Sequence, residues 1–345
     1  MQKVLIRRPG GFGRLEIVEA EAPVAGPGSA VVQVASAGVN FADCVVRMGL
    51  YPSAKEYVGW PITPGFEFAG TVQSLGEGPN PRGIAVGDEV LGVLRFGAQA
   101  THIEVPLSQM FRLPSNVSLL QAGAIPVAAL TAMYALVVQG GAKEGARVLV
   151  HSAAGGVGTL LVQLAQHLNC RVVGVVGAPH KTETVMAMGA DAVIDKSCEN
   201  LFEAAKRHCP EGYDIVLDAN GVQTLRGSYA ALRPTGRLVI YGAHTMLSRG
   251  AGRPNWLKLA WDFVRTPQFN PLRLTNENKS VLAFNLSYLF EEQQMLQDSL
   301  AQICQLYATG ALSPVPLREI PFAQVQLAHR ELQSGKTVGK LALVF

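Results

Sequence analysis

Three glycines lie close together in the segment HSAAGGVG (151–158), between the strand-like run ARVLVH and a helix-like run that ends near Leu168. Amide groups at the start of a helix attract anions, and glycines let a pyrophosphate approach the backbone closely. The residues expected to contact a dinucleotide there are Ala154, Gly155, Gly156, Val157 and Gly158. Ala153 replaces the first glycine of the G-x-G-x-x-G motif, so the match to the motif is incomplete. The prediction of a nucleotide site therefore depends on the position of the turn between a strand and a helix. The alternative is a tight turn without a ligand.

The segment after the next strand bears on which dinucleotide this turn would bind. NAD enzymes usually carry an acidic residue at the end of the second strand, where it binds the ribose hydroxyls. In RVVGVVGAPHK, Gly177 takes that place and Lys181 follows shortly after. A carboxylate would repel the additional phosphate of NADP and a lysine would attract it, so the sequence favours NADPH, with Lys196 as a second basic contact. The alternative for Lys181 is a solvated lysine in the first turn of a helix.

The glycine turn opens a regular alternation of strands and helices that starts near residue 146. Strand-like runs such as RVVGVVG, DAVID, YDIVLDAN and RLVIYG alternate with helical patterns. Strands this apolar, separated by helices, predict an α/β fold with a doubly wound parallel sheet. The first third contains short Val- and Ile-rich runs broken by glycine and proline, which predict a small, partly open β-barrel. A helix (QQMLQDSLAQICQLYATG) and a last strand (KLALVF) are expected to return to the barrel.

Composition narrows the class of protein. The chain has 345 residues, a length typical of about two domains, and its formal net charge of +3 is too balanced to indicate a nucleic-acid partner. Its five cysteines are scattered and never form C-x-x-C, which argues against a disulfide framework or a structural zinc lobe. We see no secretory signal at the N-terminus, and we interpret the uncharged stretch 113–142 as a buried helix rather than a membrane span. A cytoplasmic protein is therefore expected.

Several segments together carry a family resemblance. GVNFADCVVRMGLYP, PITPGFEFAGTVQSLG and AAGGVG resemble the medium-chain dehydrogenases/reductases, in particular their zinc-independent quinone reductase and enoyl reductase branch. LRPTGRLVIYGAH, NWLKLAWDFVR, AFNLSYL and GKTVGKLALVF are similar to the synaptic-vesicle amine-transport (VAT) proteins. The resemblance runs nearly end to end. It implies a discontinuous GroES-like catalytic domain (1–125 and 270–345), a Rossmann NADP-binding domain (126–269), an active site between them, and a homodimer joined near AFNLSYL.

The resemblance also bears on metal and catalytic residues. Zinc-dependent members carry a cysteine in G-x-C-x-x-D and a histidine in G-H-E, where this chain has Asn40 and Phe66. Neither side chain suits Zn²⁺, so no catalytic zinc is expected. The enoyl reductase pattern N-x-x-D-(x5)-G-x-Y-P matches from Asn40 to Pro52. It implies that Tyr51 donates a proton or anchors an enolate and that Asn40 lines the nicotinamide pocket. The alternatives are packing on the barrel for Tyr51 and capping a turn for Asn40; His244 is a second-choice donor.

Six further positions are assigned to the cofactor by the same matching. Thr131 would touch the nicotinamide ribose, Asn220 and Gly242 end the fourth and fifth sheet strands where ligands bind, and the segment with Phe284 and Leu286 would clasp the carboxamide. Lys340 matches a basic position near the pyrophosphate. Each of these residues has ordinary packing, or a surface charge in the case of lysine, as its alternative.

The function expected from these features is an NADPH-dependent, zinc-independent reduction of quinones or α,β-unsaturated carbonyl compounds by hydride transfer. The alternative is a VAT-type vesicle- or lipid-associated binding protein with weak or no reductase activity. Its expected lipid contact is the stretch 253–265, with Trp256 and Trp261 at the membrane interface and Arg253, Lys258 and Arg265 near anionic lipid. The same stretch is also interpreted as a substrate flap or a dimer contact.

Overall fold

The structure is a computed structural model that describes residues 1–247, 250 and 252–345. The chain divides into two compact units. The barrel unit comprises residues 1–130, the described part of 249–254, and 287–345. The Rossmann unit comprises 131–248, as far as it is described, and 255–286. The GroES-like barrel and the Rossmann sheet are the architecture that the sequence predicts, and each unit is described by itself below.

A parallel sheet organises the Rossmann unit. Its strand order is β10-β9-β8-β11-β12-β13, and all five neighbouring pairs are parallel. The strands are β8 (Arg147–Val150), β9 (Arg171–Val176), β10 (Ala192–Asp195), β11 (Tyr213–Asp218), β12 (Leu232–Ile240) and β13 (Ser280–Ala283). The order reverses at β8, so the point beside it is where ligands bind in open sheets of this kind.

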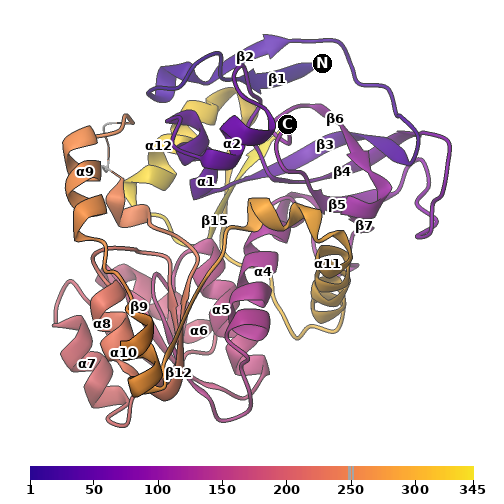
Figure 1. Ribbon diagram of the computed structural model, residues 1–345. Coiled ribbons are helices and arrows are strands. Elements are labelled where there is room, and N and C mark those ends of the chain that lie inside the picture. The colour runs from indigo at the N-terminus through magenta and orange to yellow at the C-terminus, as the bar shows by residue number, and fades with distance from the viewer. Residues whose placement is uncertain (248–249, 251) are drawn as a thin grey trace. The chain divides into compact units, whose positions relative to one another are not determined.

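Helices cover both faces of this sheet. Figure 1 shows α5 (Gly156–His167) and α6 (Thr182–Ala187) on one face and α7 (Leu201–His208) and α8 (Leu225–Ala230) on the other. The apolar side chains Leu160, Leu161, Leu164 and Ala165 of α5 are buried. The remaining elements are η4 (Pro179–Lys181), η5 (His244–Met246), α9 (Trp256–Arg265), α10 (Pro271–Glu277) and the π-helical turn Tyr134–Gln139, which continues from α4 (Pro126–Met133) across the unit boundary.

The barrel unit is built on a mostly antiparallel sheet of order β14-β15-β3-β4-β5-β7, with β6 also paired to β3. Its strands are β3 (Ser29–Val39), β4 (Glu67–Leu75), β5 (Glu89–Val93), β6 (His102–Pro106), β7 (Met110–Arg112), β14 (Leu317–Pro321) and β15 (Lys340–Val344). β1 (Gln2–Leu5) pairs with β2 (Glu16–Glu19). The expected final strand KLALVF is β15, and it pairs with β3 as Leu341 opposite Val39. This pairing brings Lys340 to the end of β3, where α1 begins.

Short helices complete the barrel unit. They are α1 (Phe41–Arg47), α2 (Pro52–Tyr57), α3 (Leu119–Ala122), α11 (Gln293–Ala308) and α12 (Val325–Ser334), with 3₁₀ turns η1 (Phe12–Arg14), η2 (Leu107–Gln109), η6 (Leu286–Glu291) and η7 (Phe322–Gln324). The helix expected over QQMLQDSLAQICQLYATG is α11. Within the described residues, no helix is both long and apolar enough to cross a membrane.

The domain boundaries differ from the sequence division. The sequence assigned 270–286 to the barrel domain, but β13 pairs in parallel with β12 and extends the Rossmann sheet. The first boundary falls after Leu130 rather than after residue 125. Both differences have one cause: a short edge strand such as SVLA and an uninterrupted helix such as α4 leave no composition change in the sequence to mark where a unit ends.

Candidate functional site

The glycine turn of the Rossmann unit joins β8 to α5. Gly155 is the N-cap of α5 and provides no side-chain hydrogen bond, so the first helical amides are not satisfied by a cap. Gly155 itself donates its backbone N–H to Ser152 O at 2.9 Å, and within α5 the amide of Thr159 donates to Gly155 O at 2.9 Å. A Cβ on Gly158 would lie 2.3 Å from Ser152 O, so a side chain there would push the helix away from the strand. The turn thus presents amide donors of Gly156, Val157 and Gly158 at the positive end of a 12-residue helix.

Basic residues gather after the second strand of the sheet. β9 ends at Val176, and Gly177 follows it; the Cε atom of Lys196 lies 3.5 Å from where a Gly177 Cβ would stand. Lys196 also donates its backbone N–H to Val176 O at 3.1 Å. Lys181 closes the 3₁₀ turn η4 that follows Gly177. The structure therefore brings Gly177 and Lys196 side by side, with Lys181 four residues along the chain from Gly177.

An acidic residue also lies here, and the sequence analysis did not weigh it. Asp195 ends β10, and its Oδ1 accepts hydrogen bonds from the backbone N–H of Ser197 at 2.9 Å and from Ser197 Oγ at 2.7 Å. Burial opposes ionisation, but these hydrogen bonds from Ser197 hold the pKa of Asp195 below its usual value. This carboxylate is satisfied within its own turn.

A buried polar network lies at the carboxyl ends of β8 and β11. Asp218 Oδ2 accepts from Ser228 Oγ at 2.7 Å, and Ser228 Oγ lies 2.9 Å from His151 Nε2. Burial lowers the pKa of His151, although nearby Asp218 opposes the shift. Neither His151 nor Ser228 was a candidate from the sequence. A polar residue closing each of two apolar strands, VLVH and DIVLD, is the signal that could have found His151 and Asp218.

This network positions Asn220. Asp218 Oδ1 accepts the backbone N–H of Asn220 at 2.8 Å, and Asn220 Oδ1 accepts from Ser152 Oγ at 2.9 Å. The Nδ2 atom of Asn220 is buried and has no hydrogen-bond partner among the described residues. A buried amide donor without an acceptor costs free energy, so this edge of the sheet fits a ligand with an acceptor, as a nicotinamide dinucleotide would provide.

The other predicted cofactor residues of this unit are also placed. Gly242 follows β12, and a Cβ there would lie 2.8 Å from Ala219 O. Phe284 donates its backbone N–H to Ile240 O at 3.2 Å, and its ring packs on Tyr134 with centroids 4.7 Å apart. Leu286 ends the unit, while Thr131 and Ala154 are buried. Gly242 and Phe284 therefore follow neighbouring strands, β12 and β13, at the carboxyl edge of the sheet. The sequence predicted this position for Gly242 but not for Phe284.

The polar centre of the barrel unit consists of Asn40, Glu67 and Lys340. Lys340 Nζ donates to Glu67 Oε1 and to Asn40 Oδ1, each at 2.6 Å, and Asn40 Nδ2 donates to Glu67 Oε1 at 2.8 Å. Glu67 Oε2 accepts the backbone N–H of Val127 at 2.7 Å. The Glu67 side chain is fully buried and that of Lys340 is 5% exposed. A Cβ on Gly38 would stand 2.1 Å from Glu67 Oε1, so glycine leaves the room that this carboxylate occupies.

These contacts change the role assigned to Lys340. The sequence resemblance put it near the pyrophosphate, but in the structure its ammonium group is buried in the barrel unit and bound to Glu67 and Asn40. A role at the pyrophosphate would require breaking a buried ion pair. We therefore regard Lys340 as the residue that fixes the Asn40 carboxamide.

Asn40 and Asp43 cap α1 reciprocally. Asp43 Oδ2 accepts the backbone N–H of Asn40 at 2.7 Å, and Asp43 Oδ1 accepts that of Gly65 at 2.8 Å. Complete burial raises the pKa of Asp43 to about 7, against the lowering effect of these two backbone donors and of Lys340. Asp43 thus bonds to the backbone at two places, the start of α1 and Gly65. Asn40 is thus both the N-cap, which was its alternative interpretation, and part of the polar centre.

Tyr51 belongs to an aromatic cluster in the same unit. Its ring centroid lies 5.8 Å from that of Phe66 and 6.4 Å from that of Phe96, in edge-to-face arrangements. At the position where zinc-dependent relatives carry a histidine ligand, this chain therefore has the packed aromatic ring of Phe66. Within the described residues, no group of three or more His, Cys, Asp or Glu side chains is arranged to hold a metal ion.

Comparison with known proteins places this geometry in a family. A pattern described as "Alcohol dehydrogenase GroES-like domain" matches residues 26–115, and one described as "Zinc-binding dehydrogenase" matches 188–343. The human synaptic vesicle membrane protein VAT-1 homolog is 33% identical over 97% of this chain and 84% of its own length. This chain belongs to the medium-chain dehydrogenase/reductase family.

Two solved structures are similar over the whole chain. A quinone oxidoreductase of Escherichia coli, complexed with NADPH, has a TM-score of 0.86 at 26% identity and covers 100% of both chains. A quinone oxidoreductase of Pseudomonas syringae has a TM-score of 0.86 at 27% identity and covers 100% of this chain and 99% of its own. Both likenesses extend through the barrel and Rossmann units.

The buried ion pair of the barrel unit generates a stability prediction. Lys340→Met should lower the free energy of unfolding by about 3–5 kcal/mol, because it leaves the Glu67 carboxylate buried without its cation. Urea unfolding followed by circular dichroism measures the loss. Lys336→Met, at an exposed lysine nearby in the sequence, is the matched control and should change stability by less than about 0.5 kcal/mol. Equal effects of the two substitutions would show that the ion pair does not stabilise the fold.

Proposed function

We propose that this protein is an NADPH-dependent oxidoreductase that reduces quinones or α,β-unsaturated carbonyl compounds without zinc. The observation that carries the proposal is the uncapped glycine turn at the start of α5, together with Gly177 and Lys196 beside it. The turn fits a pyrophosphate, and the likeness to a quinone oxidoreductase complexed with NADPH supports the choice of cofactor. NADPH, when bound, would supply the hydride.

Selection of NADPH over NADH is assigned to Lys181 and Lys196. The end of β9 carries no carboxylate to bind ribose hydroxyls, because Gly177 stands there. An ammonium group in that place attracts the additional phosphate of NADPH. Asp195, the nearby acid, has its hydrogen bonds taken by Ser197, which lessens its competition for the lysines.

Two positions in the barrel unit support a reduction that does not use zinc. At the two positions where zinc-dependent relatives carry ligands, Asn40 is bound to Lys340 and Glu67, and Phe66 packs on Tyr51 and Phe96. A conjugated carbonyl accepts electrons without a Lewis acid if a hydrogen-bond donor stabilises the developing enolate. We assign that donor role to the Tyr51 hydroxyl and the orientation of a polar substrate or cofactor group to Asn40. A homodimer joined along β13, the edge strand of the Rossmann sheet, is part of the same proposal.

One kinetic experiment tests this function. NADPH oxidation is followed with a panel of quinones, enones and enoyl thioesters, using the wild type and Tyr51→Phe. We expect turnover, with the rate on an enone about 10²-fold lower in Tyr51→Phe and the quinone rate largely kept, since a quinone accepts electrons without a dedicated donor. Tyr57→Phe, on the same helix, is the matched control. No turnover with any acceptor would contradict the function; a full enone rate in Tyr51→Phe would remove only the assignment of Tyr51.

Cofactor selection gives a separate prediction. Lys181→Ala and Lys196→Ala should each weaken NADPH binding about tenfold, because each removes a charge-assisted bond to a phosphate, and should leave NADH binding unchanged. Fluorescence titration of both cofactors measures the dissociation constants, with Lys206→Ala as the control. If the wild type binds both cofactors equally well, the two lysines do not discriminate.

A second candidate function rests on α9. Its apolar side chains are exposed to an unusual degree, including Trp256 at 67%, Leu257 at 86% and Trp261 at 62%. An amphipathic helix with exposed tryptophans can lie at a membrane interface, and the human relative is named a synaptic vesicle membrane protein. Lys258, however, is bound to Asp262 and to Thr245 O, so of the three basic residues first considered Arg253 and Arg265 are the better lipid contacts.

Liposome co-sedimentation tests this second function. Vesicles with anionic lipid should retain the wild type, and Trp256→Ala combined with Trp261→Ala should release it, because the two rings supply most of the aromatic surface of α9. Vesicles of neutral lipid and the double variant Tyr57→Ala with Tyr288→Ala, at exposed tyrosines of the barrel unit, are the controls. Retention that does not depend on the two tryptophans would contradict a lipid role for α9.

A further inference from the structure

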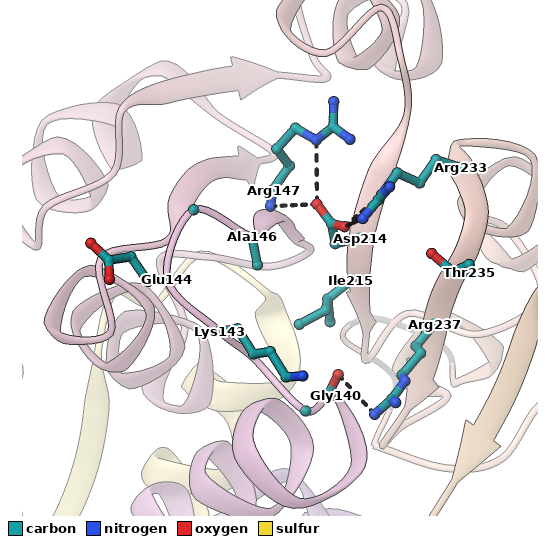
Figure 2. Close-up of a pocket in the computed structure, with 12 residues that line it drawn as sticks. Gly140, Lys143, Glu144, Ala146, Arg147, Asp214, Ile215, Arg233, Thr235 and Arg237 are labelled. Carbon is teal, nitrogen blue, oxygen red and sulfur yellow. Dashed lines mark hydrogen bonds and ion pairs between the residues drawn. The ribbon is translucent and has the colours of Figure 1, made fainter.

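A cavity lies within the Rossmann unit, at the amino ends of its central strands. It has a volume of about 500 Å³ and lies where β8, β11 and β12 begin, whereas the glycine turn follows the carboxyl end of β8. This volume is within the range of small-molecule sites. Figure 2 shows the side chains that line it, which come from the loop before β8, from the start of β11 and from the first half of β12.

One carboxylate fixes two guanidinium groups at this cavity. Asp214 Oδ2 accepts from the backbone N–H of Arg147 at 2.8 Å and from Arg147 Nε at 3.3 Å, and Asp214 Oδ1 accepts from Arg233 Nε at 2.5 Å. Burial alone would raise the pKa of Asp214, but these hydrogen bonds hold it below its usual value. Arg147 also pairs with the exposed Glu211. The two arginines are therefore held in place rather than free to sample solvent.

Among the residues that the structure describes, two further cations of the lining have no carboxylate partner. Arg237 Nη1 donates to the carbonyl oxygens of Gln139 and Gly140, each at 3.2 Å, and these neutral acceptors leave its charge uncompensated. Within the described residues, no hydrogen bond or ion pair involves Lys143 Nζ. Gly141 makes room for the arginine, since a Cβ there would lie 2.4 Å from Arg237 Nη1. In Figure 2 Glu144, the other acid of the lining, points away from this group.

A hydroxyl group completes the lining. Thr235 has a φ of 73°, a left-handed conformation that is rare for a β-branched residue. Its backbone N–H donates to Asn278 O at 2.6 Å, which holds the turn within β12 in this conformation. The cavity thus combines four cationic side chains (Lys143, Arg147, Arg233 and Arg237), two acidic ones (Asp214 and Glu144) and a hydroxyl donor.

We propose that this cavity is a binding site for a compact anion with two or more negative charges, such as a phosphorylated small molecule. Arg147 and Arg233 form the fixed wall, and Arg237 and Lys143 supply the charges that such an anion would neutralise. A carboxylate-rich anion offers the same chemistry as a phosphorylated one, so the ligand class is defined by charge and size. The site is separate from the dinucleotide turn and does not depend on the proposed reductase activity.

Isothermal titration with inorganic pyrophosphate and, in a second arm, with citrate tests the proposal. The protein is kept saturated with NADPH, so that the glycine turn is not available to the probe. We expect one binding site, with affinity about tenfold weaker in Lys143→Gln and again in Arg237→Gln, because each removes one cation that contacts the anion. Lys143→Gln breaks no hydrogen bond or ion pair within the described residues, so it separates anion binding from any loss of folding caused by Arg237→Gln.

A charge-matched control completes the test. Lys336→Gln combined with Arg226→Gln removes one lysine and one arginine that are exposed and do not line the cavity, and it should leave pyrophosphate affinity unchanged. Weakening of both probes in the cavity variants supports a site selective for charge, and weakening of pyrophosphate alone supports a phosphate site. Wild-type affinity in Lys143→Gln, or an equal loss in the control variant, overturns the proposal.

Discussion

The buried ion pair between Lys340 and Glu67 is the constraint on which the barrel unit's polar centre depends. Removing an ammonium and a carboxylate from water costs several kcal/mol for each ion, and only close, hydrogen-bonded pairing offsets that cost. Lys340 starts β15, Glu67 starts β4, Asn40 lies between β3 and α1, and the Val127 amide belongs to α4. Four segments of the chain therefore meet at this ion pair, and the carboxamide of Asn40 is oriented at both its oxygen and its nitrogen as a result.

The two edges of the Rossmann sheet present different groups that can bind an anion. At the carboxyl edge, backbone amides of the glycine turn and the buried amide of Asn220 are available, while the lysines lie at the margin, after β9 and β10. At the amino edge, guanidinium groups are held by Asp214 and by the carbonyl oxygens at the end of the π-helical turn. Amides suit a ligand that must be approached closely by the backbone, whereas guanidiniums suit compact, multiply charged groups.

Most of the architecture could be predicted from the sequence, since the apolar alternation from ARVLVH onward has a period that only a wound parallel sheet explains. The turn residues 154–158 and the neighbours Gly177 and Lys196 could be selected as cofactor candidates for the same reason, because that prediction depends only on the local order of residues along the chain. The contact of Lys340 with Glu67 and Asn40 could not be predicted, because it depends on the pairing of β15 with β3, which no local sequence pattern specifies. The sequence division left β13 outside the Rossmann domain, because four residues at a sheet edge carry too little periodicity to set a domain boundary. The network of His151, Ser228 and Asp218 was missed because its partners come from three separate elements.

The partners of the barrel's ion pair are separated by 273 positions along the chain, and the whole of the Rossmann unit lies between them. A chain that folds during synthesis can therefore complete the parallel sheet while Glu67 still lacks its cation, since domains tend to fold as units in the order in which they emerge. Until β15 is synthesised, burying the Glu67 carboxylate would cost free energy because Lys340 is not there to pair with it. The second half of β3 also lacks the strand that pairs with it in the folded protein. The discontinuous barrel unit is thus the later of the two units to finish folding, because its ion pair can form only after Lys340 has been synthesised.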